Sequence, residues 1–297
     1  MVHRAALFPG VIIASLLGGA LLAVPAQWAL GHFFTPGFDN VLTITTLVCG
    51  FLLALAYVRI TGPLSVAALG LHWHDRDRLD VLVGFLAGLL ILGVLEAGLL
   101  LLGVHEMRHN QEYVRMEIAS VVVQSFMIGL VVALKEEVLF RGALLTGLLR
   151  CHRKITAMLV CSVFYAATHY LKYPETTPGT AIDWYTGLQL LPTALRWFAS
   201  PGTPPVLVSL FLIGLLLVLL RLRRDSLWPC IGLHAGFVTG YKIAGYCTNR
   251  VPDAQYGFFL SSDSPVLGWF AVAWLTAVFV MCCRFCPAAT VRLRETA

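Results

Sequence analysis

The chain has 297 residues, of which 58% are hydrophobic and only 12% are charged, and its mean hydropathy is +0.80. Soluble domains carry about 25% charged residues, so this composition excludes an ordinary soluble protein and indicates a polytopic membrane protein. The formal net charge of +5 is no sign of nucleic-acid binding, because basic residues in a membrane protein mostly set its topology.

Eight apolar stretches are long enough to be membrane-spanning helices. They cover residues 6–29, 41–60, 81–104, 117–140, 155–171, 204–221, 227–247 and 266–285. The predicted fold class is therefore all-α, a bundle of about eight transmembrane helices. Between the fifth and sixth stretches, residues 172–203 mix tryptophan and tyrosine with polar residues, which is typical of a segment that lies along the membrane surface.

Basic residues are distributed unequally between the two sides of this bundle. Thirteen arginines and lysines fall on one side and five on the other, and the positive-inside rule places the first side in the cytoplasm. We expect an integral protein of a bacterial inner (plasma) membrane with both termini in the cytoplasm. The chain divides into residues 1–115 with three helices, a central core of residues 116–250, and residues 251–297 with one helix and a short tail.

The hydrophobic segment Leu134–Leu149, which begins in the fourth stretch, carries Glu136, Glu137 and Arg141 where lipid would otherwise surround them. A charge at the centre of the bilayer costs roughly 2.5–3.5 kcal/mol, so each one needs a partner. Glu137 and Arg141 are four residues apart and can pair on one face of the helix. Glu136 points about 100° away from Glu137, so this pairing does not account for it.

Two histidines from other helices are expected near the depth of Glu136. The three helices are taken to meet the cytoplasm near Arg150, Lys154 and Arg224. Glu136 lies 14 residues before Arg150, His169 lies 15 residues after Lys154, and His234 lies 10 residues after Arg224. These separations correspond to depths of about 21, 22 and 15 Å. A buried carboxylate and two imidazoles can activate water and stabilise an oxyanion, as peptide hydrolysis requires, or they can hold a metal ion. Each residue alone can instead be structural, as an ion pair, a helix cap or a packed core histidine.

Three motifs in this region resemble those of one family. EEVLFRG, from Glu136 to Gly142, is similar to the EExxxR motif of the CAAX-protease and bacteriocin-processing family, which comprises intramembrane endopeptidases related to the type II CAAX prenyl endopeptidases. YAATH, from Tyr165 to His169, resembles the family's FxxxH motif with tyrosine in place of phenylalanine. SLWPCIGLHA, which contains His234, resembles the last motif region, and together the matches cover about residues 130–240.

The resemblance implies a catalytic role for five residues. Glu136 would be the base that activates water, while Glu137 and Arg141 would orient it and hold the site. His169 and His234 would position the water and stabilise the oxyanion. We expect no cofactor; in the alternative, metal-dependent mechanism, Glu136, His169 and His234 would bind zinc.

One position departs from the family pattern. The family usually has asparagine or aspartate four residues after the last histidine, and here that position is Val238. A hydrogen-bond donor or metal ligand is therefore missing. Either a neighbour such as Tyr241 or Asn249 replaces it, or the activity is altered or lost.

The sequence thus predicts an intramembrane endopeptidase that hydrolyses membrane-associated or lipid-modified proteins or peptides. Its partners would be membrane lipids and a peptide or protein substrate, without nucleic acid, and its oligomeric state is left open. One alternative is a proton-coupled transporter, in which Glu96 would join the proton path; another is a catalytically silent scaffold. A third is a zincin-type protease, because His105, Glu106 and His109 spell HExxH, which on a helix places two zinc ligands beside a general base.

Overall fold

The computed structural model describes residues 7–31, 36–108, 114–171, 173–176 and 181–285. Nearly all regular structure in these residues is helical, which confirms the all-α class, and two three-residue strands form the remainder. The elements are α2 (Leu7–Leu30), α3 (Phe38–Thr61), α4 (Asp77–Leu101), β1 (His105–Met107), α5 (Val114–Glu137), η1 (Val138–Leu144), α6 (Leu145–Cys151), α7 (Lys154–Thr168), α8 (Thr186–Ala194), η2 (Arg196–Ala199), α9 (Thr203–Arg224), α10 (Trp228–Cys247), β2 (Thr248–Arg250), η3 (Gly257–Phe259) and α11 (Trp269–Phe285).

The helices support an integral membrane protein. Within the described ranges, five helical segments are long and apolar enough to cross a membrane: α2, α3, α4, residues Glu117–Cys151 and α9. Two further apolar helices, α7 and α11, are shorter. The predicted seventh stretch forms α10, which is not among these candidates, so the predicted number of eight spans is not confirmed.

Glycines set the packing of α10 against its neighbours. On α4, Gly84 and Gly88 face α10, and on α10, Gly232 and Gly236 face α4; a Cβ atom at any of the four would collide with the backbone of the opposite helix. Gly129 of α5 lies in the same way against α10. Small residues let membrane helices approach backbone to backbone. α10 is therefore held closely between α4 and α5, and it carries His234 at a fixed place.

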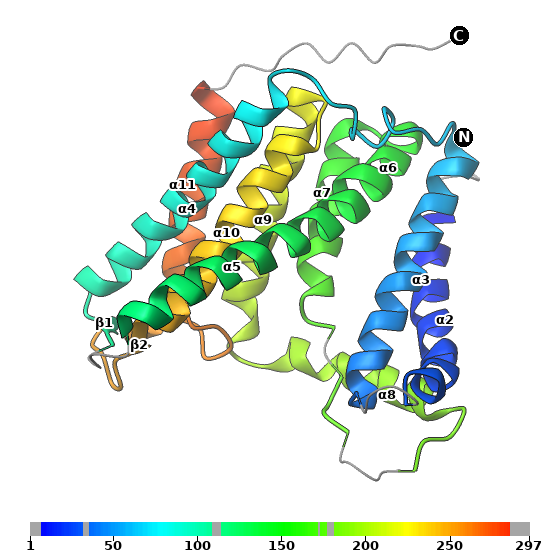
Figure 1. Cartoon of the computed structure of the whole chain (residues 1–297), viewed down its shortest axis with the longest axis horizontal. Helices are drawn as coiled ribbons and strands as arrows, with labels where there is room; N and C mark the ends of the chain where they lie inside the picture. Colours follow the sequence, from blue (N-terminus) through cyan, green and yellow to red (C-terminus); the bar gives the residue numbers. More distant parts are fainter. Residues whose placement is uncertain (1–6, 32–35, 109–113, 172, 177–180, 286–297) are drawn as a thin grey trace.

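The helices α2 and α3 form a pair at one end of the molecule (Figure 1). Gly19 of α2 packs directly against Thr46 of α3, and Gly187 of α8 packs against the backbone of Ala20. Figure 1 shows α8 running across the ends of α2 and α3, and α7 with α6 lying between this pair and the α4–α10–α11 side of the bundle.

The predicted fourth helix is continuous to Cys151, but its winding changes in the middle. α5 ends at Glu137 and is followed by a π-helix, η1, before α6 begins. The N–H of Leu145 donates to the carbonyl of Phe140, five residues back, instead of four. The sequence predicted an uninterrupted α-helix here. π-helices are rare and occur frequently at functional sites.

Candidate active site

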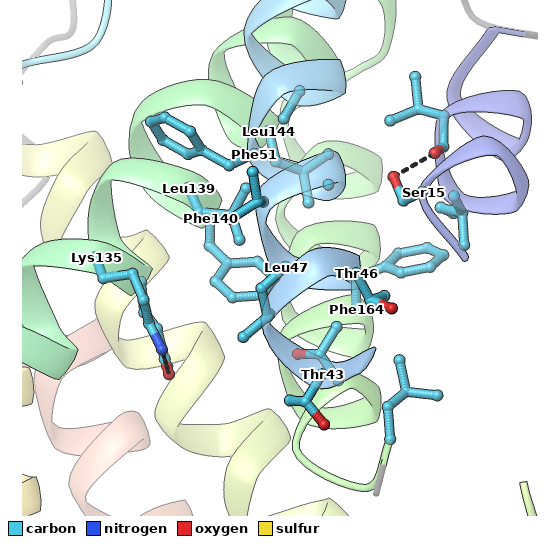
Figure 2. Close-up of a pocket in the computed structure, with 18 of the residues that line it drawn as sticks. Ser15, Thr43, Thr46, Leu47, Phe51, Lys135, Leu139, Phe140, Leu144 and Phe164 are labelled. Atoms are coloured by element: carbon cyan, nitrogen blue, oxygen red, sulfur yellow. Dashed lines mark hydrogen bonds and ion pairs between the residues drawn. The ribbon is translucent and has the colours of Figure 1, made fainter. Parts of the chain in front are cut away.

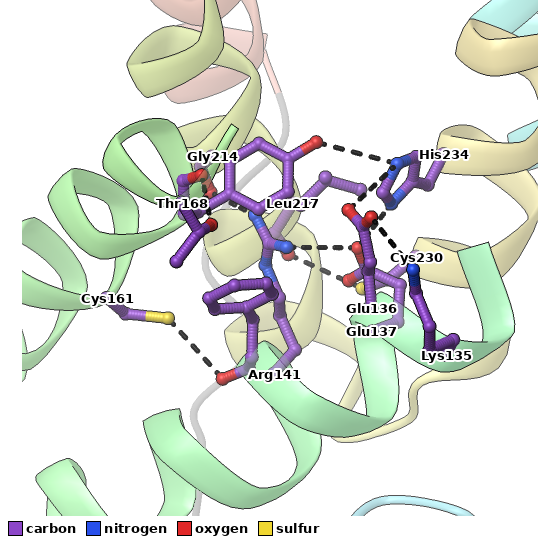
Figure 3. Close-up of polar contacts among 12 residues, drawn as sticks. Lys135, Glu136, Glu137, Arg141, Cys161, Thr168, Gly214, Leu217, Cys230 and His234 are labelled. Atoms are coloured by element: carbon purple, nitrogen blue, oxygen red, sulfur yellow. Dashed lines mark hydrogen bonds and ion pairs between the residues drawn. The ribbon is translucent and has the colours of Figure 1, made fainter. Parts of the chain in front are cut away.

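Glu137 and Arg141 form an ion pair that is sealed from solvent. Arg141 Nη1 lies 3.0 Å from Glu137 Oε1, and both side chains are fully buried. This contact confirms the pairing predicted from their spacing. Arg141 also donates from Nη2 to the carbonyl oxygen of Gly214 on α9, 3.3 Å away, and its guanidinium lies 4.3 Å from the centre of the Tyr165 ring. The guanidinium therefore links η1 to α7 and α9 (Figure 3).

His234 is oriented by the same carboxylate oxygen. Its Nδ1 lies 2.7 Å from Glu137 Oε1. An ionised carboxylate only accepts hydrogen bonds, so His234 donates from Nδ1, and Nε2 of the neutral ring then carries no proton. That Nε2 faces the Tyr165 hydroxyl at 3.5 Å and Glu136 Oε2 at 3.8 Å.

His169 is held in the same way by a backbone carbonyl. It directly follows the last residue of α7, and its Nδ1 lies 2.7 Å from the carbonyl oxygen of Tyr165. Because a carbonyl accepts, Nδ1 of His169 is also the donor, and Nε2 of the neutral ring is again an acceptor. This Nε2 lies 3.6 Å from Glu136 Oε2.

Glu136 stands where the two histidines meet. Its Oε2 atom is buried and has no hydrogen-bond partner among the described residues. The other oxygen, Oε1, lies 3.7 Å from Lys135 Nζ, whose side chain is half exposed. Three acceptor atoms, Glu136 Oε2 and the two Nε2 atoms, therefore face one another. They need a hydrogen-bond donor between them, and a water molecule offers two protons for that purpose.

A cavity of about 710 Å³ reaches Glu136 and His169. It lies between α2 and α3 on one side and α5, η1 and α7 on the other (Figure 2). Its walls are mainly aliphatic and aromatic, and they include Leu16, Leu47, Phe51, Val131, Leu139, Phe140, Leu144 and Phe164. The volume is that of a typical small-molecule pocket. The buried acid thus borders an apolar space that is large enough for a flexible hydrophobic chain.

Glu136, His169 and His234 are also the residues that would hold a metal ion if one were bound. Glu136 and two Nε2 atoms, each ring backed by a hydrogen bond from Nδ1, are of the chemical type that zinc uses. In the described part of the chain, however, no group of three or more His, Cys, Asp and Glu side chains is arranged to hold a metal ion. The same three atoms can instead hold a water molecule without a metal, because all three are hydrogen-bond acceptors.

The HExxH segment forms a strand and not the helix that a zincin requires. Residues His105 to Met107 make β1, which pairs antiparallel with β2 and places Glu106 opposite Asn249. His105 is buried with Nδ1 2.6 Å from Glu96 Oε1, whereas Glu106 is exposed. Successive side chains of a strand point to opposite faces, so the zincin prediction is wrong for His105 and Glu106. His109 lies outside the described residues.

The other acids, and the residues suggested as replacements at position 238, bond to partners away from Glu136. Glu96 is paired with His105, and Glu117 accepts a hydrogen bond from the Tyr246 hydroxyl at 2.9 Å. The hydroxyl of Tyr241 lies 3.5 Å from Ser264 Oγ. Asn249 belongs to β2 and accepts from Arg108 Nε at 3.2 Å. The suggested replacements for the missing donor are thus engaged away from Glu136.

Sequence reasoning overlooked Tyr165 as a polar member of this group. Its ring lies at T-shaped geometry to His169 and His234, with centroids 4.6 and 5.9 Å apart, and its hydroxyl faces His234. The available signal was the tyrosine that replaces phenylalanine in the second motif. The structure brings together all five predicted residues and adds this sixth.

Comparison with known proteins finds a match to a family model over part of the chain. Residues 118–239 match the family model described as "Type II CAAX prenyl endopeptidase Rce1-like". Comparisons with curated proteins and with solved structures give no match. The matched segment falls within the predicted core of residues 116–250 and contains Glu136, His169 and His234. The match supports a protease that acts on peptide or protein substrates in a membrane. Residues 118–239, less than half of the chain, are thus similar to the Rce1-like family of type II CAAX prenyl endopeptidases.

Proposed function

We propose that this protein is an intramembrane endopeptidase in which Glu136 activates a water molecule for attack on a peptide bond. The observation that carries the proposal is the convergence of Glu136 Oε2, which has no partner among the described residues, with two imidazole Nε2 atoms at 3.6 and 3.8 Å. A base must lie within hydrogen-bond reach of the proton that it removes, and a water between these atoms meets that condition.

The reaction follows from the hydrogen bonds of the site. Water donates one proton to Glu136 Oε2 and the other to the Nε2 atom of His169. As the water oxygen attacks the carbonyl carbon, Glu136 takes its proton, and the carbonyl oxygen becomes an oxyanion. The protonated Glu136 then gives that proton to the leaving amine, which restores the carboxylate as the carbon–nitrogen bond breaks. Glu137 and Arg141 do not exchange protons; they fix His234 in its orientation.

The cavity supports a lipid-modified or membrane-associated substrate. It is about 710 Å³, apolar, and bordered by Glu136 and His169. A hydrocarbon or isoprenoid chain next to the scissile bond would lie in it, because its aliphatic and aromatic walls suit such a chain. The positive-inside bias supports both termini in the cytoplasm, and we propose an integral protein of a plasma membrane such as the bacterial inner membrane.

The test is a cleavage assay with the detergent-purified protein. The probes are a library of internally quenched peptides and a peptide that carries a farnesylated cysteine three residues before its carboxyl terminus. Glu136→Gln keeps the shape of the side chain and removes the base, so we expect cleavage to fall by about 10²–10⁴-fold. Glu117→Gln, a carboxylate that bonds Tyr246, is the matched control and should retain the wild-type rate.

Three outcomes decide between the alternatives. Cleavage that survives in Glu136→Gln would refute the proposed role of this residue. Cleavage abolished by a chelator and restored by zinc would assign the mechanism to a metal held by Glu136, His169 and His234. Absence of cleavage in the wild-type protein on every probe would favour the silent scaffold, for which Val238 is the sequence argument.

A further inference from the structure

The hydrogen bonds of His169 and His234 leave no donor at either Nε2 atom for an oxyanion. Both rings donate from Nδ1, one to Glu137 and the other to the carbonyl of Tyr165, so both neutral Nε2 atoms are acceptors. A developing oxyanion needs donors aimed at it. Val238, one helical turn after His234, has an aliphatic side chain and offers none. The site as proposed therefore requires another donor.

The hydroxyl of Tyr165 lies beside His234 Nε2, next to the Glu136 carboxylate. Its side chain is 2% exposed, and its hydroxyl oxygen lies 3.5 Å from His234 Nε2. Because that nitrogen is an acceptor, the tyrosine donates in this contact. The distance is long for a hydrogen bond of this type, and catalytic hydrogen bonds often shorten only when substrate is bound.

The tyrosine ring is also held rigidly. The Arg141 guanidinium lies 4.3 Å from the ring centre, and Phe140 meets the ring edge to face at 5.4 Å. His169 and His234 contact it as well. A donor fixed before the reaction costs no reorganisation in the transition state, which is the condition for effective oxyanion stabilisation. Packing thus aims the hydroxyl at the space bounded by His234 and Glu136.

We propose that the Tyr165 hydroxyl is a catalytic residue that donates a hydrogen bond to the substrate carbonyl oxygen as this atom becomes an oxyanion. The inference rests on the proposed function, because it needs a peptide carbonyl beside Glu136. Tyr165 keeps its proton throughout and forms no covalent bond. When the oxyanion forms, the hydroxyl turns from His234 Nε2 to the substrate oxygen, and the imidazole remains available to accept from water.

The experiment compares Tyr165→Phe with Tyr57→Phe. Each substitution removes one hydroxyl from a tyrosine that is at most 2% exposed, but Tyr57 lies on α3 against Gly147 of α6. Phenylalanine is also the residue of the family motif at position 165, so the variant is expected to fold. Rates are divided by the folded fraction, measured by thermal unfolding. The probes are the quenched peptides and the farnesylated peptide described above.

We expect kcat of Tyr165→Phe to fall by about 10²–10³-fold, the effect of losing one oxyanion donor, with KM changed by less than about twofold. Tyr57→Phe should stay within about twofold of wild type. A phosphonate analogue of the cleaved peptide carries the anionic oxygen of the intermediate. Its affinity should fall with kcat in Tyr165→Phe, while the affinity of the substrate peptide itself should not.

Several results would overturn the assignment. Equal kcat values for the two tyrosine variants would exclude a donor role. A slower Tyr165→Phe enzyme with unchanged phosphonate affinity and a shifted pH profile would show that the hydroxyl only positions His234. If Glu136→Gln retains activity, or the wild-type protein cleaves nothing, the proposed function fails together with this inference. If Glu136→Gln is inactive but Tyr165→Phe is not, only the inference fails.

Discussion

Replacing Arg141 by methionine should destabilise the protein far more than the same change at a surface arginine. Arg141 and Glu137 are both fully buried and lie 3.0 Å apart. At an effective dielectric constant of about 20, two charges at that distance attract by about 5.5 kcal/mol. Arg141→Met leaves the Glu137 carboxylate buried with His234 as its remaining partner, and loss of one member of a buried pair costs about 3–5 kcal/mol.

Arg224 supplies the matched control. It pairs with Asp80 at 3.3 Å, but its side chain is 49% exposed, so Arg224→Met should cost at most about 1 kcal/mol. The assay is reversible unfolding by SDS in detergent micelles, followed by tryptophan fluorescence, which gives a free energy of unfolding for each variant.

The double variant Glu137→Gln/Arg141→Met completes the test. It removes both charges, so it should be more stable than Arg141→Met alone by about 2 kcal/mol, although His234 then donates to a neutral amide oxygen instead of a carboxylate. Two results would refute the electrostatic reasoning: equal losses in Arg141→Met and Arg224→Met, or a double variant whose loss equals the sum of the two single losses.

Three further predictions concern packing, the cavity and the β1 segment. Gly232→Ala adds a methyl group where α10 touches the α4 backbone, and it should lower the free energy of unfolding by about 1–3 kcal/mol. Gly93→Ala has open space around it, so the free energy of unfolding should stay equal or rise by up to about 1 kcal/mol. SDS unfolding measures both variants, and equal shifts would contradict the packing argument. Leu47→Trp should lower kcat/KM for the farnesylated peptide about tenfold because it fills the cavity, and Leu52→Trp, on an exposed face of α3, should not; a loss in both would point to a general defect. His105→Ala leaves the buried Glu96 carboxylate of α4 unpaired, so it should lower the free energy of unfolding by about 1–3 kcal/mol. The cleavage rate per folded molecule should not change. A loss of that rate would indicate that His105 takes part in catalysis.

The part of the site that could be predicted is the part governed by helical spacing. Glu137 and Arg141 are one turn apart, and the structure pairs them. The shared depth of Glu136, His169 and His234 followed from counting residues along three helices, and in the structure both imidazoles lie within 4 Å of the Glu136 carboxylate. Rise per residue is fixed by the backbone, so it transfers from sequence to structure without knowledge of tertiary contacts.

What could not be predicted depends on contacts between distant segments. HExxH suits a zinc-binding helix locally, but residues 105–107 pair with residues 248–250 across more than 140 positions, and this ladder decides their conformation. The tautomers of His169 and His234 depend on which acceptor faces each Nδ1. The role that we propose for Tyr165 depends on the direction of one hydroxyl, which a motif with an aromatic residue at that position does not specify.

The π-helix between α5 and α6 has a consequence for insertions and deletions in this chain. Each turn of a π-helix contains more residues than an α-helical turn, so η1 amounts to one surplus residue at the position where the acidic pair ends. Deleting one residue from Gly142–Leu144 would remove that surplus and let ordinary α-helical winding continue from α5 into α6, with both helices close to their present phase. Leu145 and Leu148, which are now buried, would then stay directed into the core. A one-residue deletion within α5 would instead rotate the acidic pair by about 100° relative to the preceding part of the helix. A change of one residue in length is therefore tolerated better at η1 than in the α-helical turns before it.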